Sequence, residues 1–441
     1  MGVHSTEKKQ LSVRGMLNNV RSVFEKIPDN PKDTRGQKSK IPLADCLMAG
    51  LAMFSLKMPS LLQFNNQRND EVIKHNLQTL YGIESPPSDT YMRERLDPVD
   101  PKALRPTYTA IFRELQRGKV LENYAFMNGR YLTPLDGTGV FSSNSVHCKN
   151  CCEKHLQNGT ITYHHQILSA VIVHPDLKEV FPLCPEPIIK QDGKQKNDCE
   201  TNACHRLLAD LIREHPHLKV IVTGDAIHSS GPRITQLKAD DMQFILGVKP
   251  GSHGSLFEWI SGLSLDTHEI VEDGIAYTFR WVNQVPLNDA HPDLLVNFLD
   301  CIIDDPKNGQ KHFSWVTDIP ITKENVYKLS RGGRAKWKIE NETFNTLKNQ
   351  GYNFEHNYGH GNENLSTIFS MLMMLAFFID QVQQRACGMF QAALTKMKTR
   401  TALWEKIRSL FTEYYVDAWA DLFYAIATGQ GRARLPPMQP P

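Results

Sequence analysis

The sequence lacks a long hydrophobic run. Its longest apolar stretch, "IFSMLMMLAFFI" at residues 368–379, is shorter than the roughly 20 residues that a membrane-spanning helix needs, so we expect it to be a buried core helix. No apolar segment follows the first Met, and the opening "MGVHSTEKKQLSVRG" does not have the form of a secretory signal peptide. We therefore expect a cytoplasmic protein with no membrane partner.

The chain also has little net charge. Its 50 Lys and Arg residues face 48 Asp and Glu residues, which gives a formal charge of +2. Any contact with nucleic acid must then come from local basic patches. The 441 residues are 41% hydrophobic and 22% charged, a composition that excludes disordered, collagenous and coiled-coil proteins and allows a large core in two or three domains.

The N-terminal part is polar and basic and then becomes helical. Residues 1–40 hold nine Lys or Arg and four acids, which is typical of a solvated tail. Helical patterns follow, so residues 1–125 are predicted to form a basic tail and a helical DNA-binding domain. The segment "SDTYMRERLD" at 88–97 has a Ser cap and two arginines, like a short recognition helix. A merely solvated arginine face would give the same pattern.

The middle of the chain alternates between strand and helix patterns. The apolar strands "YLTPLDGTGVF", "TITYHHQILSAVIVHP", "LKVIVTGDAI" and "MQFILGVKP" predict an α/β fold, with a mixed sheet and flanking helices at residues 126–250 and 325–385. Residues 251–324 are predicted to be a β-rich insertion. Residues 386–441 are predicted to be a helical C-terminal region with a Pro-rich tail.

Two aspartates occupy similar positions on predicted core strands. Asp136 in "PLDGTG" and Asp225 in "VTGDAIHSSG" each follow apolar residues and precede small ones, which allow a ligand to approach the backbone. Either residue alone is more simply a turn or helix cap. Together with an acid on a later helix, they predict carboxylates that converge on Mg²⁺ or Mn²⁺, and two such ions can catalyse an in-line phosphoryl displacement.

Helix geometry distinguishes two candidate glutamates in "WKIENETFNTLK". At about 100° per residue, Glu340 falls on the apolar face with Phe344 and Leu347, whereas Glu342 falls on the polar face. A buried carboxylate is costly without a cation, so Glu340 is the predicted metal ligand. The alternative is a structural ion pair with Lys336 or Lys348.

These residues resemble a known family. The order Asp136, Asp225, Glu340, with a β-rich stretch before the glutamate, resembles the bacterial insertion-sequence DDE transposases whose ribonuclease-H-like domain carries a β-insertion, the insertion-sequence-four-like group. The string "WKIE" at residues 337–340 matches the family signature in place. Three positions depart from it: Gly333 replaces a Tyr, Lys336 replaces an Arg, and Lys348 comes one residue late.

The resemblance implies a specific chemistry and specific partners. Asp136, Asp225 and Glu340 would be the catalytic ligands of Mg²⁺ or Mn²⁺, for DNA cleavage at transposon ends and strand transfer into target DNA. Contacts to DNA phosphates would come from Lys348, Lys336 and Arg334. The partners would be double-stranded DNA and a second copy of the chain in a synaptic complex, associated with the bacterial nucleoid. A domesticated metal-dependent nuclease and a catalytically silent DNA-binding protein are the alternatives.

A cluster of cysteines and histidines follows Asp136. In "HCKNCCEKH", Cys148, Cys151 and His155 have the spacing of metal ligands, and His164 is the assigned fourth ligand, with His165 or Cys199 as alternatives. We therefore predict a candidate structural zinc site, the alternative being reduced thiols in a polar loop. The stretch "FEHNYGHG" at 354–361 is predicted to be a polar loop near the active site, with metal binding by its histidines as the less favoured interpretation.

Overall fold

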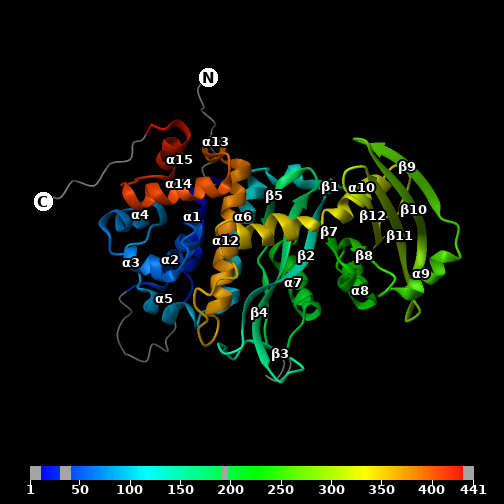
Figure 1. Ribbon diagram of the computed structural model, residues 1–441, viewed down its shortest axis with the longest axis horizontal. Helices are drawn as coiled ribbons and strands as arrows, with labels where there is room; N and C mark the ends of the chain where they lie inside the picture. The colour runs from blue at the N-terminus through cyan, green and yellow to red at the C-terminus, as the bar shows by residue number, and fades with distance from the viewer. Residues whose placement is uncertain (1–10, 30–40, 191–196, 431–441) are drawn as a thin grey trace, which may run out of the picture.

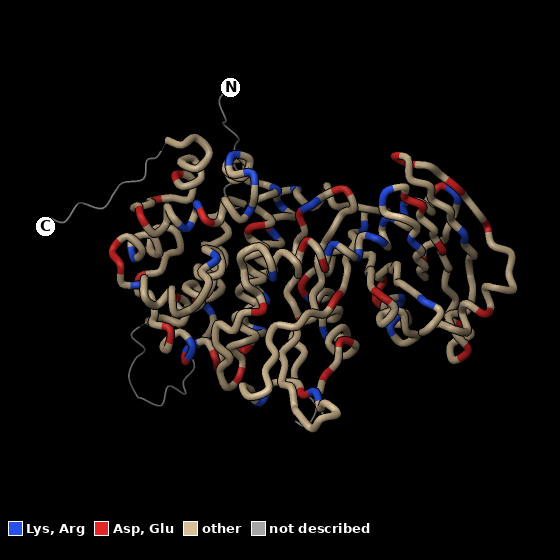
Figure 2. Tube along the Cα trace, in the orientation of Figure 1, with Lys and Arg blue, Asp and Glu red and all other residues tan. Residues whose placement is uncertain are grey.

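The computed structural model describes residues 11–29, 41–190 and 197–430. The described chain is elongated (Figure 1). Helices from both ends of the sequence gather at one end of the molecule, a mixed sheet lies in the middle, and a group of antiparallel strands forms the other end. Lys, Arg, Asp and Glu are interspersed along the whole length (Figure 2), in keeping with the small net charge.

The N-terminal helices begin at polar caps. Ser12, Ser60, Asp70 and Ser88 each accept a backbone N–H in the first turn of a helix, which satisfies donors that the helix itself leaves free. The helices are α1 (Val13–Phe24), α2 (Leu43–Ser55), α3 (Leu61–Gln67), α4 (Glu71–Tyr81), α5 (Asp89–Leu96) and α6 (Arg105–Arg117).

Helix α1 corrects the prediction of a solvated tail. Its residues Met16, Leu17, Val20 and Phe24 are buried. The many charges between residues 1 and 40 concealed this apolar stripe, which recurs with the helical period. Residues 1–10 and 30–40, also assigned to the tail, lie outside the described residues, as does the Pro-rich tail at 431–441.

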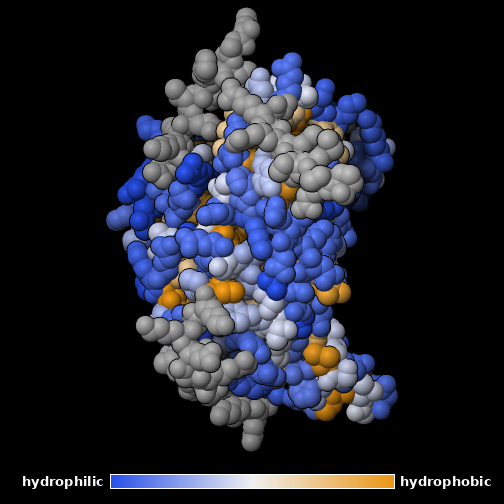
Figure 3. Space-filling view, turned by 90° about the vertical axis from the view of Figure 1, so that its left-hand side faces the viewer, coloured by the Kyte–Doolittle hydropathy of each residue, from blue (hydrophilic) through white to orange (hydrophobic). Residues whose placement is uncertain are grey.

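The apolar helix α12 (Leu365–Ala386) lies in the core. Its length and hydropathy would allow it to cross a membrane, but its most apolar window is completely buried inside the protein. The predicted core helix is therefore confirmed. Helices α2, α5 and α6 pack against α12. The outer face of this end of the molecule is mainly hydrophilic, with apolar residues in small separate patches (Figure 3).

The C-terminal helices join the N-terminal ones. Helices α13 (Gly388–Met397), α14 (Arg400–Glu413) and α15 (Trp419–Thr428) follow α12, and α14 packs on α4. The amide of Asn76 donates to the carbonyls of Phe411 and Tyr414, both at 2.7 Å. The two regions that we predicted as separate helical parts thus share one bundle.

The central sheet has the strand order β5-β4-β2-β7-β8. Strands β5, β4 and β2 pair antiparallel, and β7 and β8 then pair parallel to β2. The predicted α/β class is confirmed. Helices α7 (Glu200–Glu214) and α8 (Gly231–Ala239) precede β7 and β8. The strands of this part are β1 (Ala125–Met127), β2 (Arg130–Ser143), β3 (Cys152–His155), β4 (Ile161–His174), β5 (Leu177–Pro182), β6 (Glu186–Ile188), β7 (Val220–Gly224) and β8 (Gln243–Gly247).

The β-rich residues extend this sheet. Strand β12 pairs antiparallel with β8, through Trp315–Gly247, Val316–Leu246 and Thr317–Ile245. The sheet therefore continues through β12, β11, β10 and β9 without a break. The additional elements are α9 (Gly254–Ser261), β9 (Asp266–Glu272), β10 (Ile275–Asn288), β11 (His291–Asp305) and β12 (Gly309–Thr317).

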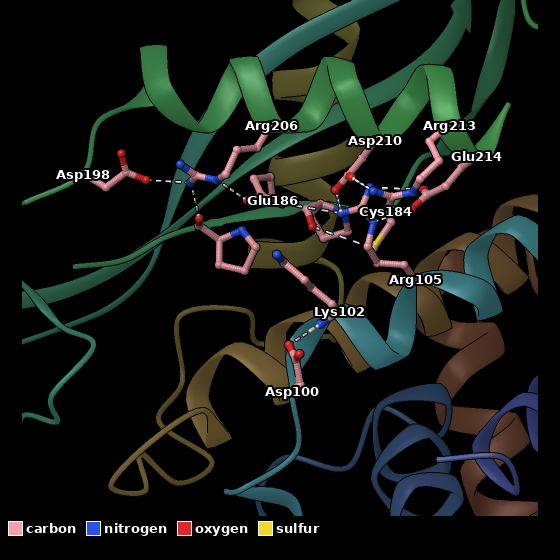
Figure 4. Close-up of polar contacts among 12 residues, drawn as sticks. Asp100, Lys102, Arg105, Cys184, Glu186, Asp198, Arg206, Asp210, Arg213 and Glu214 are labelled. Carbon is pink, nitrogen blue, oxygen red and sulfur yellow. Dashed lines mark hydrogen bonds and ion pairs between the residues drawn. The ribbon is translucent and has the colours of Figure 1, made fainter. Parts of the chain in front are cut away.

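A buried group of ion pairs connects the helical bundle to the sheet (Figure 4). Arg105, at the start of α6, pairs with Glu186 of β6 and with Asp210 and Glu214 of α7. Arg206 adds pairs with Glu186 and Asp198, and Arg213 adds pairs with Asp210 and Glu214. These seven residues are called the Arg105 network below.

Candidate active site

The two aspartates meet at one edge of the sheet. Strands β2 and β7 pair in parallel up to Pro134–Thr223, and Asp136 and Asp225 each lie two residues beyond that pair. Asp225 directly follows β7, as predicted. Asp136 does not end its strand: β2 continues to Ser143 because β4 still pairs with it, with Asp136 opposite Ser169.

One ammonium group lies among the three predicted acids. The Nζ atom of Lys336 is 3.4 Å from Asp136 Oδ2 and 3.8 Å from Asp225 Oδ2. It also donates a hydrogen bond to the Glu340 carboxylate. The side chains of Asp225 and Glu340 are 54% and 52% exposed, so this face of the site is open to a large ligand.

The expectation that Glu340 is buried was wrong. Glu340 is exposed, and Glu342, which we predicted to face water, is half-buried. The reason is that residues Ile339–Phe344 form a π-helical segment, η5, between α10 (Val326–Arg334) and α11 (Asn345–Asn349). A π-helix closes its hydrogen bonds at i→i+5, so the 100° rotation used to place the side chains does not apply there.

The structure adds a fourth carboxylate, which the sequence interpretation missed. Glu200, in the first turn of α7, lies against Gly137: a Cβ atom at Gly137 would come within 2.3 Å of Glu200 Oε1. Burial, and then the charges of Asp136 and Asp225, raise the pKa of Glu200. The available signal was a glycine directly after the candidate Asp136, because a glycine allows such close approach.

The site carries more negative than positive charge. Burial raises the pKa of Asp136, against the lowering effect of Lys336. Burial alone would lower the pKa of Lys336, but the hydrogen bond with Glu340 and the charges of the aspartates raise it. Nearby His228 adds no second cation at neutral pH, because burial lowers its pKa to about 4. Thus one ammonium faces four carboxylates.

This set of donors fits a hard divalent cation. Carboxylate oxygens are the ligands that Mg²⁺ and Mn²⁺ prefer. The four carboxylates come from a strand, a strand end, a π-helical segment and a helix, and each interacts with the charge of Lys336. They could hold such an ion if the ammonium of Lys336 moved aside.

The other two predicted phosphate contacts lie elsewhere. Lys348 pairs with Glu355 at 2.7 Å, and the guanidinium of Arg334 lies over the ring of Phe313, 5.5 Å from its centroid. Only Lys336 among the three contacts the acids. Gly333 stands where the transposase signature has a Tyr. A larger residue does not fit at this position, because a Cβ atom at Gly333 would come within 2.5 Å of the Trp315 ring.

The cysteine and histidine cluster has a different membership from the predicted one. Cys148 and Cys151 gather with His165 and His360, and their four ligand atoms all lie within 4.8 Å of one another. His155 is instead exposed and pairs with Glu153. His164 is excluded because neighbouring residues on a strand point to opposite faces, and His165 is the one that faces the cysteines.

The arginines of α5, the candidate recognition helix, both have acidic partners. Arg93 pairs with Asp89 at 3.0 Å, and Arg95 pairs with Asp29. The Ser88 cap is present as predicted. DNA contact by this helix stays a prediction.

Comparison with known protein families and with curated proteins gives no match. Among solved structures, the chain is similar to a piggyBac transposase in a synaptic complex with hairpin DNA. The two share 10% sequence identity at a TM-score of 0.41, over 89% of this chain and 77% of the other. At this identity and TM-score the likeness carries no argument about family or function.

Proposed function

We propose that this protein is a DDE-type transposase, which cleaves DNA strands at the ends of a mobile element and transfers them to target DNA. The observation that carries the proposal is the meeting of Asp136, Asp225 and Glu340 around Lys336, at the edge of a ribonuclease-H-like sheet. The β-rich strands between Asp225 and Glu340 support the insertion-sequence group that carries such an insertion.

The acids have the roles of metal ligands in this proposal. Asp136, Asp225 and Glu340 would hold Mg²⁺ or Mn²⁺, which supplies Lewis-acid activation of the attacking hydroxyl and stabilisation of the leaving oxygen. Glu200 adds a fourth carboxylate from α7. Because Asp225 and Glu340 face solvent, the carboxylates can approach a phosphodiester in a bound DNA duplex.

Lys336 has two roles in succession. Without a divalent cation its ammonium neutralises part of the charge of the three acids. With a cation held by the acids, Lys336 would be free to contact a DNA phosphate, where a positive charge favours both binding and the charge that develops on the phosphoryl oxygens. Lys348 and Arg334 would add phosphate contacts farther from the scissile bond, and a second copy of the chain would hold the other transposon end.

The test is cleavage of labelled DNA that carries the inverted repeats flanking the gene. We expect Mg²⁺-dependent nicking by the wild type and by the control Glu342→Gln. The rate should fall about 10²–10³-fold, as expected when electrostatic stabilisation is removed, in Asp136→Asn, Asp225→Asn and Glu340→Gln. These variants should still bind the ends in a gel-shift assay.

Two results would contradict the proposal. If the wild type binds the ends but does not cleave them with Mg²⁺ or Mn²⁺, the protein is not an active transposase or nuclease. If Glu342→Gln loses as much activity as Glu340→Gln, the assignment of the third acid is wrong. Cleavage without strand transfer would identify a nuclease instead.

A further inference from the structure

Four nitrogen and sulfur atoms outside the acidic site lie within 4.8 Å of one another. The two sulfurs, Cys148 Sγ and Cys151 Sγ, are 3.8 Å apart, and the Nε2 atom of His165 is 3.4 and 3.3 Å from them. His360 Nε2 is 3.3 Å from Cys151 Sγ. Bonds of about 2.3 Å to sulfur and about 2.0–2.1 Å to nitrogen place tetrahedral ligands roughly 3.3–3.8 Å apart. The four distances above lie in this range.

The cluster is shielded from water. Cys151, His165 and His360 are buried, and Cys148 is half-buried. The ring of Phe141 packs on His360, with centroids 4.3 Å apart, and lies 6.2 Å from that of His165. The group contains no carboxylate among the described residues. Thiolate and imidazole ligands without oxygen donors favour zinc over Mg²⁺.

Hydrogen bonds fix the loop of Cys148 and Cys151 to the loop of His360. The Asn150 amide donates to the carbonyl of Glu363 at 2.9 Å and to the side chain of Asn364 at 3.0 Å. Asp97 accepts four backbone N–H groups of residues 362–365, at 2.8–3.0 Å. The protein framework therefore holds the ligand-bearing segments in place around the cluster.

The ligands come from three separate parts of the chain. Cys148 and Cys151 lie in the loop between β2 and β3, His165 lies on β4, and His360 lies just before α12. A metal ion here would join the edge of the sheet to the central helix of the bundle. Strand β2, which carries Asp136, is the immediate partner of β4.

We propose that Cys148, Cys151, His165 and His360 bind one structural zinc ion, which clamps the sheet that carries Asp136 to the start of α12. The four ligands leave no open position for a substrate, as in closed structural sites. The ion stabilises the folded state because it binds residues that only the fold brings together. This site is separate from the acidic one and does not depend on the proposed transposase activity.

The chain offers matched control variants. Cys152 is next to Cys151 but outside the cluster, with its thiol donating to the carbonyl of Ile188, and His164 is next to His165. The full-length protein, purified from zinc-supplemented cells, should hold about one equivalent of zinc per chain by elemental analysis. Cys152→Ser and His164→Gln should retain it, whereas Cys151→Ser and His165→Gln should lose most of it.

A second measurement does not require any variant to fold. After zinc is exchanged for Co²⁺, the wild type should show a sulfur-to-cobalt charge-transfer band and the strong visible bands of a tetrahedral ion. A chelator should lower the melting temperature of the wild type, and added Zn²⁺ should restore it. Zinc content that is the same in Cys151→Ser and Cys152→Ser, or a cobalt form without the charge-transfer band, would overturn the proposal. Neither readout uses DNA, so a failed cleavage assay leaves this test unaffected.

Discussion

Two regions of this protein place carboxylates around basic side chains, and the two regions differ in net charge and in exposure to water. In the Arg105 network, three arginines face four carboxylates, and the side chains of Arg105 and Glu186 are only 7% and 5% exposed. In the acidic site, Lys336 alone faces Asp136, Asp225, Glu340 and Glu200, and half of Glu340 is exposed. The first region is nearly neutral and its central residues are buried, although Arg213 at its rim is exposed, whereas the second is strongly negative and open.

We infer from this difference that the Arg105 network stabilises the fold, whereas the acidic site binds a ligand, although both contain the same types of residue. Removing one partner from a buried ion pair leaves an uncompensated charge, which is costly, so the network is expected to matter for stability. An exposed cluster with surplus negative charge is stabilised by any cation that binds it. Its carboxylates can therefore be changed with little loss of stability, but at a loss of metal binding.

The largest expected effect is on the network. Arg105→Met should lower the free energy of unfolding by about 3–5 kcal/mol, because it leaves Glu186, Asp210 and Glu214 without their shared cation in a buried setting. Urea unfolding of both the variant and the wild type measures this. Lys336→Met is the comparison variant in the acidic site. It should change stability less, by about 1 kcal/mol, because the Asp225 and Glu340 carboxylates that it leaves unpaired are more than half exposed to water. Equal losses in the two variants would remove the distinction between the regions.

Acid should weaken the interface beside the network. His215 ends α7 and packs on Phe112 of α6, with ring centroids 4.5 Å apart. Burial lowers its pKa from 6.5 to about 4, so between these values the unfolded chain binds a proton that the folded chain does not. Stability is then full above pH 6.5 and falls as the pH drops towards 4.

The pH effect can be isolated with one variant. Going from pH 7 to pH 5, the wild type should lose about 2 kcal/mol more stability than His215→Gln, as follows from about 1.4 kcal/mol per pKa unit. Chemical denaturation at the two pH values measures the difference. The same pH dependence in both proteins would show that His215 is not buried as a neutral ring.

The next effect is on the affinity for a divalent cation, because the ammonium of Lys336 competes with such a cation for the three acids. Lys336→Met removes the ammonium that lies among Asp136, Asp225 and Glu340, so Mn²⁺ should bind about tenfold more tightly, a gain of about 1.4 kcal/mol. Titration calorimetry measures the dissociation constant. Lys348→Met should leave it unchanged, because Lys348 pairs with Glu355. Weaker binding in Lys336→Met would mean that the lysine organises the acids and does not compete for them.

Much of the fold and part of the site could be predicted from the sequence. The apolar runs before Asp136 and Asp225 predicted strands β2 and β7, because burial dictates such runs. The end of β2 was not predicted, since pairing with β4 carries the strand past Asp136 to Ser143. The environment of Glu340 was predicted wrongly, since a π-helical turn leaves no sign in hydrophobic periodicity. His360 was only a weak candidate for metal binding, because its approach to Cys151 depends on tertiary contacts of residues 209 positions apart.

Glu200 was also missed, because its approach to Asp136 depends on tertiary contacts between residues far apart in the sequence. Substitution of Glu200 gives the smallest of the expected effects. Its charge is repelled by Asp136 and Asp225 in the absence of a metal, in addition to the cost of burial. Glu200→Gln should therefore stabilise the metal-free protein by about 0.5 kcal/mol, the scale of a partly exposed charge interaction. It should also reduce the rise in melting temperature caused by Mg²⁺, because binding energy adds to stability only while the ligand is held. Glu342→Gln, on the same protein preparation, should change neither value. An undiminished Mg²⁺ effect in Glu200→Gln would limit the metal site to the three acids around Lys336.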